Sequence, residues 1–122
     1  RVAAIETQEI LKATAVSRME AEEAKGRAGL VVLKARYGNL DGREIAMDGT
    51  GPSVGGWIDV TVAVQALVAD SKLVFYNYSK ARLDGFYDVC PNEEKVLEIV
   101  YKHNGEEDTV LLDDTEEAVV PM

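Results

Sequence analysis

The sequence has few of the residues from which metal centres and covalent catalytic sites are built. It contains one cysteine, Cys90, and one histidine, His103, among 122 residues. A zinc site needs more such ligands, and a lone cysteine forms no internal disulfide, which suits a reducing compartment. Cys90 and His103 could pair as nucleophile and base, but no third, orienting residue accompanies them. We therefore expect no enzyme activity: no catalytic residues, no metal site and no cofactor.

Long apolar runs and basic residues are also scarce. No run reaches the roughly 18 apolar residues of a membrane-spanning helix, so we expect no span in this chain. Lysine and arginine number 13 against 22 aspartate and glutamate, a net charge of −9 at pH 7. An acidic surface repels phosphate groups, so nucleic acid is a poor partner. Because the first residue is Arg1 rather than Met, we expect a fragment of a longer protein.

The last part of the chain is strongly acidic. No lysine or arginine follows Lys102, whereas many carboxylates do: Glu106, Glu107, Asp108, Asp113, Asp114, Glu116 and Glu117. One interpretation is a solvated face that keeps the domain soluble, and another is a docking patch for a basic partner. Neighbouring carboxylates could also hold calcium weakly, but they lack the loop spacing of an EF-hand.

Residues 1–26 predict an N-terminal helix. The segment lacks proline and lacks glycine before Gly26, where a left-handed cap is favourable. Its apolar stripe is thin and consists of Val2, Ile5, Val16 and Met19. Such a helix suits a stalk to upstream chain, so we divide the sequence into a helix at 1–26 and a β domain at 27–122.

Alternating apolar residues predict strands in the first half of the β domain. In residues 28–37 the pattern places Val31, Leu33, Ala35 and Tyr37 on one face. The longest alternation lies in residues 57–76, with Ile58, Val60, Val62 and Val64 on one face. Within this stretch we predict the central strand first, then a turn at 69–71 and a further strand at 72–76.

The glycine-rich segment 39–56 between these strands is predicted to be a surface loop. Its run Gly49-Thr50-Gly51-Pro52-Ser53 superficially suggests a phosphate-binding loop. A Walker loop requires a Gly-Lys-Ser/Thr end, and a dinucleotide loop requires a following helix. The segment has no such lysine and a predicted strand follows, so we do not expect nucleotide binding.

The segment around Asn104-Gly105 predicts a β-hairpin with a defined register. This dipeptide favours a two-residue type I′ turn, because both residues tolerate positive φ. Pairing outwards from the turn places Lys102 opposite Glu107, Ile99 opposite Val110, and Leu97 opposite Leu112. Each such pair contributes roughly 0.2–1 kcal/mol. Residues 118–120 predict a short edge strand that Pro121 ends.

Segment 79–92 is irregular but carries large apolar side chains. One interpretation is a cap over an open end of the core. The other is a partner-binding patch formed by Leu83, Phe86 and Tyr87.

These patterns predict a mainly β fold. We expect a sandwich-like antiparallel domain of about six or seven strands preceded by one α-helix. An α+β layout of the β-grasp kind is the alternative, favoured if segment 79–92 is a core-packed helix.

Several short motifs resemble a known family over residues 29–121. They are Ala35-Arg36-Tyr37-Gly38, Ile58-Asp59-Val60-Thr61-Val62, Gln65-Ala66-Leu67-Val68, Asp70-Ser71-Lys72-Leu73, Ser79-Lys80-Ala81, Gly85-Phe86-Tyr87-Asp88 and Cys90-Pro91. In this order and spacing the sequence resembles the C-terminal domain of the DnaJ (Hsp40) homologue subfamily C member 11 family, a domain of unknown function. The likeness is most specific between Ile58 and Tyr87.

The resemblance implies a co-chaperone that has an N-terminal J domain upstream and is associated with the mitochondrial outer membrane and the machinery that organises cristae. A cytoplasmic location is the alternative. J domains act through His-Pro-Asp, but Asn104-Gly105 follows the only histidine here, so this part of the protein should not stimulate an Hsp70 ATPase. We expect a non-catalytic protein-interaction module that binds protein partners within a larger complex. The alternative is a small-ligand or substrate-binding β domain, suggested by the apolar segment near Phe86.

Overall fold

A four-stranded antiparallel sheet and a two-stranded sheet, with helices packed against them, make up the fold. The computed structural model describes residues 2–45 and 55–121. In chain order its elements are α1 (Val2–Glu23), η1 (Gly26–Ala28), β1 (Val31–Gly38), β2 (Trp57–Asp59), α2 (Thr61–Leu67), β3 (Leu73–Phe75), η2 (Lys80–Arg82), β4 (Val96–His103), β5 (Glu106–Asp113) and β6 (Ala118–Val120).

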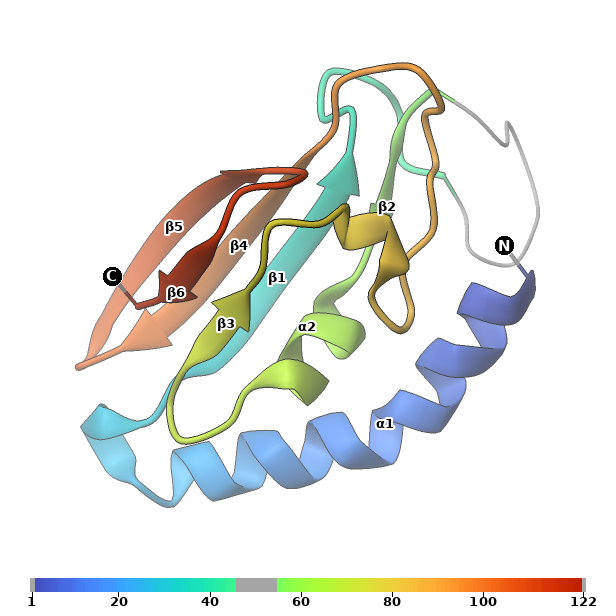
Figure 1. Ribbon diagram of the computed structural model, residues 1–122. Coiled ribbons are helices and arrows are strands. Elements are labelled where there is room, and N and C mark those ends of the chain that lie inside the picture. Colours follow the sequence, from blue (N-terminus) through green and yellow to red (C-terminus); the bar gives the residue numbers. More distant parts are fainter. Residues whose placement is uncertain (1, 46–54, 122) are drawn as a thin grey trace.

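The larger sheet has the strand order β2-β1-β4-β5, and β3 pairs with β6 in the smaller one. Figure 1 shows α1 running along the bottom of the molecule, with α2 between α1 and the sheet. The predicted class is confirmed: the described residues form one N-terminal helix and six strands in two antiparallel sheets. The second helix, α2, was not predicted.

The β4–β5 hairpin has the predicted register. Lys102 pairs with Glu107, Ile99 with Val110, and Leu97 with Leu112. Asn104 and Gly105 have φ values of 55° and 77°, as a two-residue loop of this type requires. The predicted edge strand at 118–120 is also confirmed, since β6 pairs with β3 and Pro121 follows it.

The turn predicted at 69–71 and the strand predicted at 72–76 are confirmed, since Asp70 and Ser71 have positive φ and β3 spans Leu73–Phe75. The predicted central strand before that turn is wrong beyond Asp59. β2 ends there, and α2 begins at Thr61, whose N–H donates to Asp59 Oδ1 at 2.9 Å. Val60, Val64 and Val68 are all buried. A spacing of four residues satisfies both a helical and a strand period, so these valines fit either structure. Val62, which a strand would bury on the same face, is only half-buried.

The predicted inner face of β1 is correct only in its second half. Ala35 and Tyr37 are fully buried, but Leu33 is 44% exposed and Val32 is buried instead. The pairing of β1 with β4 shifts register between Val32 and Lys34, which marks a β-bulge. The extra residue reverses the direction of every side chain before it, an effect that alternation alone does not reveal.

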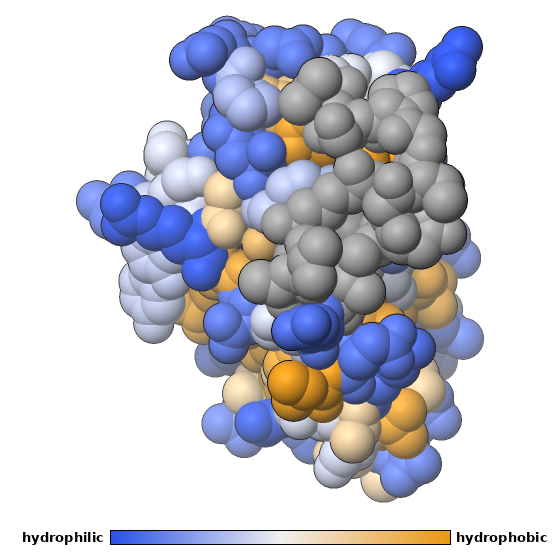
Figure 2. Space-filling view, turned by 90° about the vertical axis from the view of Figure 1, so that its right-hand side faces the viewer, coloured by the Kyte–Doolittle hydropathy of each residue, from blue (hydrophilic) through white to orange (hydrophobic). Residues whose placement is uncertain are grey.

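Helix α1 packs mainly against α2 and ends at Glu23, shortly before Gly26, which has a φ of 65°. Among its described side chains Ala15 and Glu22 are buried, whereas Val16 is 49% exposed and Ile10 is 75% exposed. Figure 2 shows apolar side chains interspersed with charged ones near the lower edge of the molecule, where α1 lies. The side chains of Val2 and Ile5 lie outside the described ones. The division at residue 26 stays a prediction.

The core lies between the inner face of the larger sheet, the helices and the smaller sheet. Its most buried large residues come from every layer: Leu30, Tyr37, Ile58, Val60, Val64, Val68, Leu73, Val89, Leu97, Ile99 and Leu112. In the predicted loop 39–56, residues 46–54, and with them most of the glycine-rich run, lie outside the described residues.

Candidate functional site: a tyrosine patch above a buried lysine

Segment 79–92 covers one end of the core. Phe86 is only 5% exposed, and its ring meets the Tyr37 ring edge-on with the centroids 5.1 Å apart. Val89 and Cys90 are fully buried, while Leu83 and Tyr87 are half-buried and pack against the core. Of the predicted partner-binding residues, Phe86 therefore belongs to the interior. A binding role for Leu83 and Tyr87 stays a prediction. The ligand-binding alternative stays a prediction.

The segment is held to the end of β5 by Lys80, whose side chain is buried. Its Nζ donates to the backbone carbonyls of Asp113 (2.7 Å), Asp114 (3.2 Å) and Glu116 (3.0 Å). The ammonium group also lies 5.5 Å from the centre of the Phe75 ring. Burial lowers the pKa of Lys80, although the carboxylates of Asp114, Glu116 and Asp113 oppose that shift. Three carbonyls and an aromatic ring replace the water that this lysine loses.

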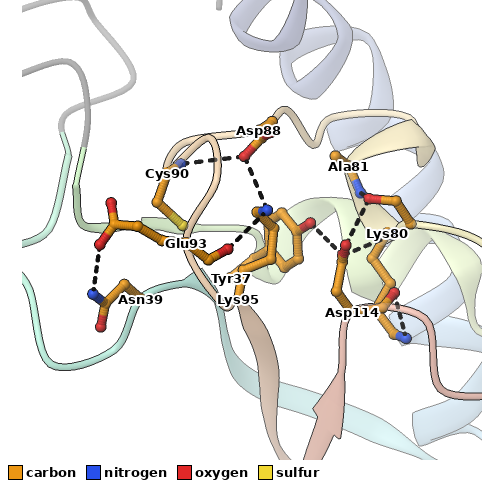
Figure 3. A network of polar contacts seen from close by, with 10 residues as sticks. Tyr37, Asn39, Lys80, Ala81, Asp88, Cys90, Glu93, Lys95 and Asp114 are labelled. Atoms are coloured by element: carbon orange, nitrogen blue, oxygen red, sulfur yellow. Dashed lines mark hydrogen bonds and ion pairs between the residues drawn. The ribbon is translucent and has the colours of Figure 1, made fainter.

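The Asp114 carboxylate collects a second set of bonds beside Lys80. Oδ1 accepts from the Tyr37 hydroxyl and from the Lys80 N–H (3.0 Å), and Oδ2 accepts from the Ser79 hydroxyl at 2.8 Å. Burial, together with the hydrogen bond and negative charge of Asp114, holds the pKa of Tyr37 far above its usual range. Figure 3 shows Tyr37, Lys80 and Asp114 converging from three separate segments. The network fixes segment 79–82 against the turn between β5 and β6.

Cys90 and His103 are far apart. The Cys90 thiol lies beside the backbone of Asn39, next to Gly38, which pairs with Val96 at the start of β4. His103 is the last residue of β4, about 23 Å along the strand from Val96. Burial raises the pKa of Cys90, which makes the reactive thiolate scarce. Within residues 2–45 and 55–121, no group of three or more His, Cys, Asp or Glu is placed to hold a metal ion.

Exposed apolar side chains gather on the outer side of β3. Val74 is 46% exposed, Tyr76 60% and Tyr78 38%, and the two tyrosine rings lie almost parallel, 10° apart in plane and 6.3 Å between centroids. Leu67 at the end of α2 is 38% exposed. A hollow of about 120 Å³ is lined by Leu67, Val74, Phe75, Tyr76, Tyr78, Lys80 and Leu83. We call the set Leu67, Val74, Tyr76, Tyr78 and Leu83 the tyrosine patch.

Sequence reasoning missed most of this patch, although a signal was present. Val74, Tyr76 and Tyr78 alternate with Leu73 and Phe75, which are buried. A strand that is apolar on both faces is typical of one that is covered on both sides. Here the second face is exposed. Of the residues predicted from sequence, only Leu83 belongs to the patch.

The patch lies beside part of the acidic C-terminal segment. Ala118 pairs with Phe75, so the preceding Glu117 lies near the Tyr76 end of the patch. Glu116 and Glu117 are exposed, whereas Asp114 is half-buried and bonded to Tyr37. The acidic segment therefore divides into exposed carboxylates and one structural carboxylate.

Comparison with known proteins identifies the family of the chain. A family model described as "DnaJ-like protein C11, C-terminal" matches residues 1–121. The chain belongs to this family. The tyrosine patch and the Lys80 network are thus features of one member of the DnaJ-like C11 C-terminal family.

Several curated proteins are similar to this DnaJ-like C11 domain. DnaJ homolog subfamily C member 11 of Mus musculus is 41% identical over 103 residues, which cover 84% of this chain and 17% of the relative. The Dictyostelium discoideum homologue is 34% identical over 99 residues, 80% of this chain and 17% of the relative. An uncharacterised J domain-containing protein of Schizosaccharomyces pombe is 30% identical over 122 residues, 99% of this chain and 18% of the relative.

This chain thus spans less than a fifth of the length of these relatives. No solved structure matches it. Among the described helices of the domain, none is both long and apolar enough to cross a bilayer.

Proposed function

We propose that this DnaJ-like C11 domain is a non-catalytic protein-interaction module, and that the tyrosine patch is its contact surface. The observation that carries the proposal is the grouping of five apolar and aromatic side chains on one side of β3, with Tyr76 60% exposed. Exposed clusters of this kind mark interaction sites, and tyrosine is enriched at the energetic centres of interfaces.

The buried polar network supports a structural rather than a catalytic role for Lys80 and Tyr37. Burial lowers the pKa of Lys80 and raises the pKa of Tyr37, and perturbed pKa values in general favour a functional site. Here the Lys80 ammonium is bonded to three carbonyls and the Tyr37 hydroxyl to Asp114. These bonds hold the floor of the patch in place, because Phe75 and Lys80 both line its hollow.

The family supports a second proposal, which concerns the whole protein. We propose that a J domain lies upstream in the full-length chain and that this domain positions it within a larger complex at the mitochondrial outer membrane. The relatives are named as DnaJ homologues or as J domain-containing proteins, and all of them are much longer than this chain. An upstream His-Pro-Asp motif in the complete gene, and fluorescence of the tagged full-length protein at mitochondria, would support it. A complete gene without that motif would refute it.

The contact surface is tested by affinity capture with two matched variants. The wild-type domain, Tyr76→Ser/Tyr78→Ser and Leu111→Ser are used as baits, and captured proteins are quantified by mass spectrometry. Leu111 is a fair control because it is 58% exposed but lies on β5, outside the patch. We expect one set of partners to be retained by wild type and Leu111→Ser and lost by the tyrosine variant. Equal capture by all three baits would refute the proposal.

A further inference from the structure

We propose that the tyrosine patch binds a proline-rich segment in the polyproline II conformation, flanked by basic residues. This inference rests on the proposed function and adds the chemistry of the partner. Four properties of the patch lead to it: the geometry of its tyrosines, the size of its hollow, its hydrogen-bonding groups and its surrounding charge.

The two tyrosines present parallel rings to solvent. They are two residues apart, their planes differ by 10°, and their centroids are 6.3 Å apart. Grooves that bind polyproline II segments are lined by aromatic rings, on which the flat pyrrolidine rings of proline pack. Exposures of 60% and 38% leave both rings accessible to such a ligand.

The hollow beside the tyrosines fits a single small side chain. Its volume is about 120 Å³, and Leu67, Val74 and Leu83 form its apolar wall. An amphipathic helix docks by a row of anchors at i, i+3, i+4 and i+7, which requires a much longer groove. Strand addition is also disfavoured, because β3 has only three residues. An extended ligand that inserts one residue at a time matches the space.

The hydrogen-bonding groups of the patch favour a ligand with few donors. Its side-chain polar atoms are the phenol hydroxyls of Tyr76 and Tyr78, which can donate to carbonyl groups. A polyproline II chain has no internal hydrogen bonds, so its carbonyls are free to accept. Proline has no N–H, and its burial against Leu67 and Val74 therefore leaves no unpaired donor.

Charge around the patch favours basic flanking residues. The chain has a net charge of −9. Exposed Glu116 and Glu117 lie at the Tyr76 end, and exposed Asp84 follows Leu83. Arg82 and the buried Lys80, both on η2, are the neighbouring cations, so against these three carboxylates the local balance is still negative. Lysine or arginine next to the prolines would be attracted to this rim, with an affinity that salt weakens.

Binding is measured by fluorescence anisotropy with labelled synthetic peptides. The probe is a run of ten prolines with one arginine at each end, and the matched peptide replaces every proline by alanine. We expect the proline peptide to bind at least tenfold more tightly than the alanine peptide, and its affinity to fall as salt is raised. We expect Tyr76→Ser/Tyr78→Ser to weaken binding at least tenfold, and Leu111→Ser to leave it unchanged.

Two results would overturn the inference. One is equal affinity for the two peptides, which would show attraction by charge alone. The other is equal binding by the tyrosine variant while its melting temperature matches that of wild type. Failure of the peptides, combined with patch-dependent capture of cellular proteins, would reject the proline-rich ligand and leave the interaction function standing. If the peptides do not bind and the capture of cellular proteins does not depend on the patch, the patch itself is rejected as a contact surface.

Discussion

The Tyr37 hydroxyl donates a hydrogen bond to the Asp114 carboxylate across 77 positions of sequence. Tyr37 lies on the central strand β1, and Asp114 lies in the turn that carries the chain from β5 to β6. Since β6 is the partner of β3, this contact links the main sheet to the small sheet that bears the tyrosine patch. The patch is thereby positioned by buried polar groups as well as by apolar packing.

Replacing Tyr37 by phenylalanine should lower the free energy of unfolding by about 1.5–3 kcal/mol, the usual value of a hydrogen bond to a charged group. The ring that packs on Phe86 is retained, so the decrease in stability measures the contribution of the hydroxyl. Urea denaturation gives the free energy of unfolding. The matched substitution Tyr76→Phe affects an exposed ring and should change stability by less than about 0.5 kcal/mol. Equal effects of the two substitutions would contradict this role of the Tyr37–Asp114 bond.

Lys80→Met should destabilise the domain by about 2–4 kcal/mol. The substitution leaves three carbonyls without their donor in a buried site, and each unpaired group carries a desolvation cost. Thermal and urea unfolding provide the measurement, with Lys72→Met as the control because Lys72 is exposed. If Lys80→Met were as stable as wild type, the ammonium would not be what holds segment 79–82 to β5.

Glu22 should make the domain sensitive to acid. Burial raises its pKa, but hydrogen bonds from Lys25 (2.8 Å) and the Leu30 N–H (2.8 Å) outweigh burial and lower the pKa from 4.5 to about 2. Because the pKa of Glu22 is lower in the folded state, the charged carboxylate stabilises the fold. This stabilisation is complete above about pH 5 and is lost as the pH falls toward 2. Over that pH range we expect protonation of Glu22 to lower the free energy of unfolding by about 2–3 kcal/mol at most. The loss is limited because Lys25 is partly exposed and water screens its charge.

The Glu22→Gln variant tests this prediction, because its side-chain oxygen can still accept from the Leu30 N–H. Unfolding free energies at pH 6, 4 and 2.5 should fall less steeply for Glu22→Gln than for wild type. Glu23→Gln removes a neighbouring exposed carboxylate and should follow the wild-type slope. Parallel slopes for all three proteins would show that the Glu22 carboxylate is not stabilised by folding.

Gly105→Ala should cost about 1 kcal/mol through the hairpin turn. Gly105 has a φ of 77°, a left-handed conformation that side chains disfavour. An added Cβ would also approach Arg27 Nη2 to 2.9 Å, and that flexible side chain would have to move away from the Asn104 carbonyl, to which it donates. Chemical denaturation measures the loss. A stability equal to wild type would mean that the turn tolerates another conformation.

Local signals in the sequence are sufficient to predict an element wherever only one structure fits the residue pattern. Asn104-Gly105 specifies its turn, and the turn then sets every pair of the β4–β5 hairpin, including Ile99 with Val110. The N-terminal helix follows equally from its composition and from Gly26. These elements depend on neighbours in sequence, so the sequence alone predicts them.

Tertiary packing decided the elements that were not predicted. Val60, Val64 and Val68 fit a strand and a helix equally well, and the space beside β1 and α1 is what selects the helix α2. The bulge at Val32 reverses the side chains before it without a glycine or proline to mark the position. Burial of Lys80 depends on carbonyls more than thirty residues away. The same long-range packing leaves Tyr76 and Tyr78 exposed, so the candidate site was only partly predictable.

Site-specific photo-crosslinking in cells tests the central claim most directly. A photo-reactive phenylalanine analogue is placed at position 76 in one full-length protein and at position 111 in another, and the cells are irradiated. We predict covalent partner adducts from position 76, none from position 111, and competition of those adducts by the arginine-flanked proline peptide. Adducts from position 111 with none from position 76 would contradict an interaction surface at the tyrosine patch.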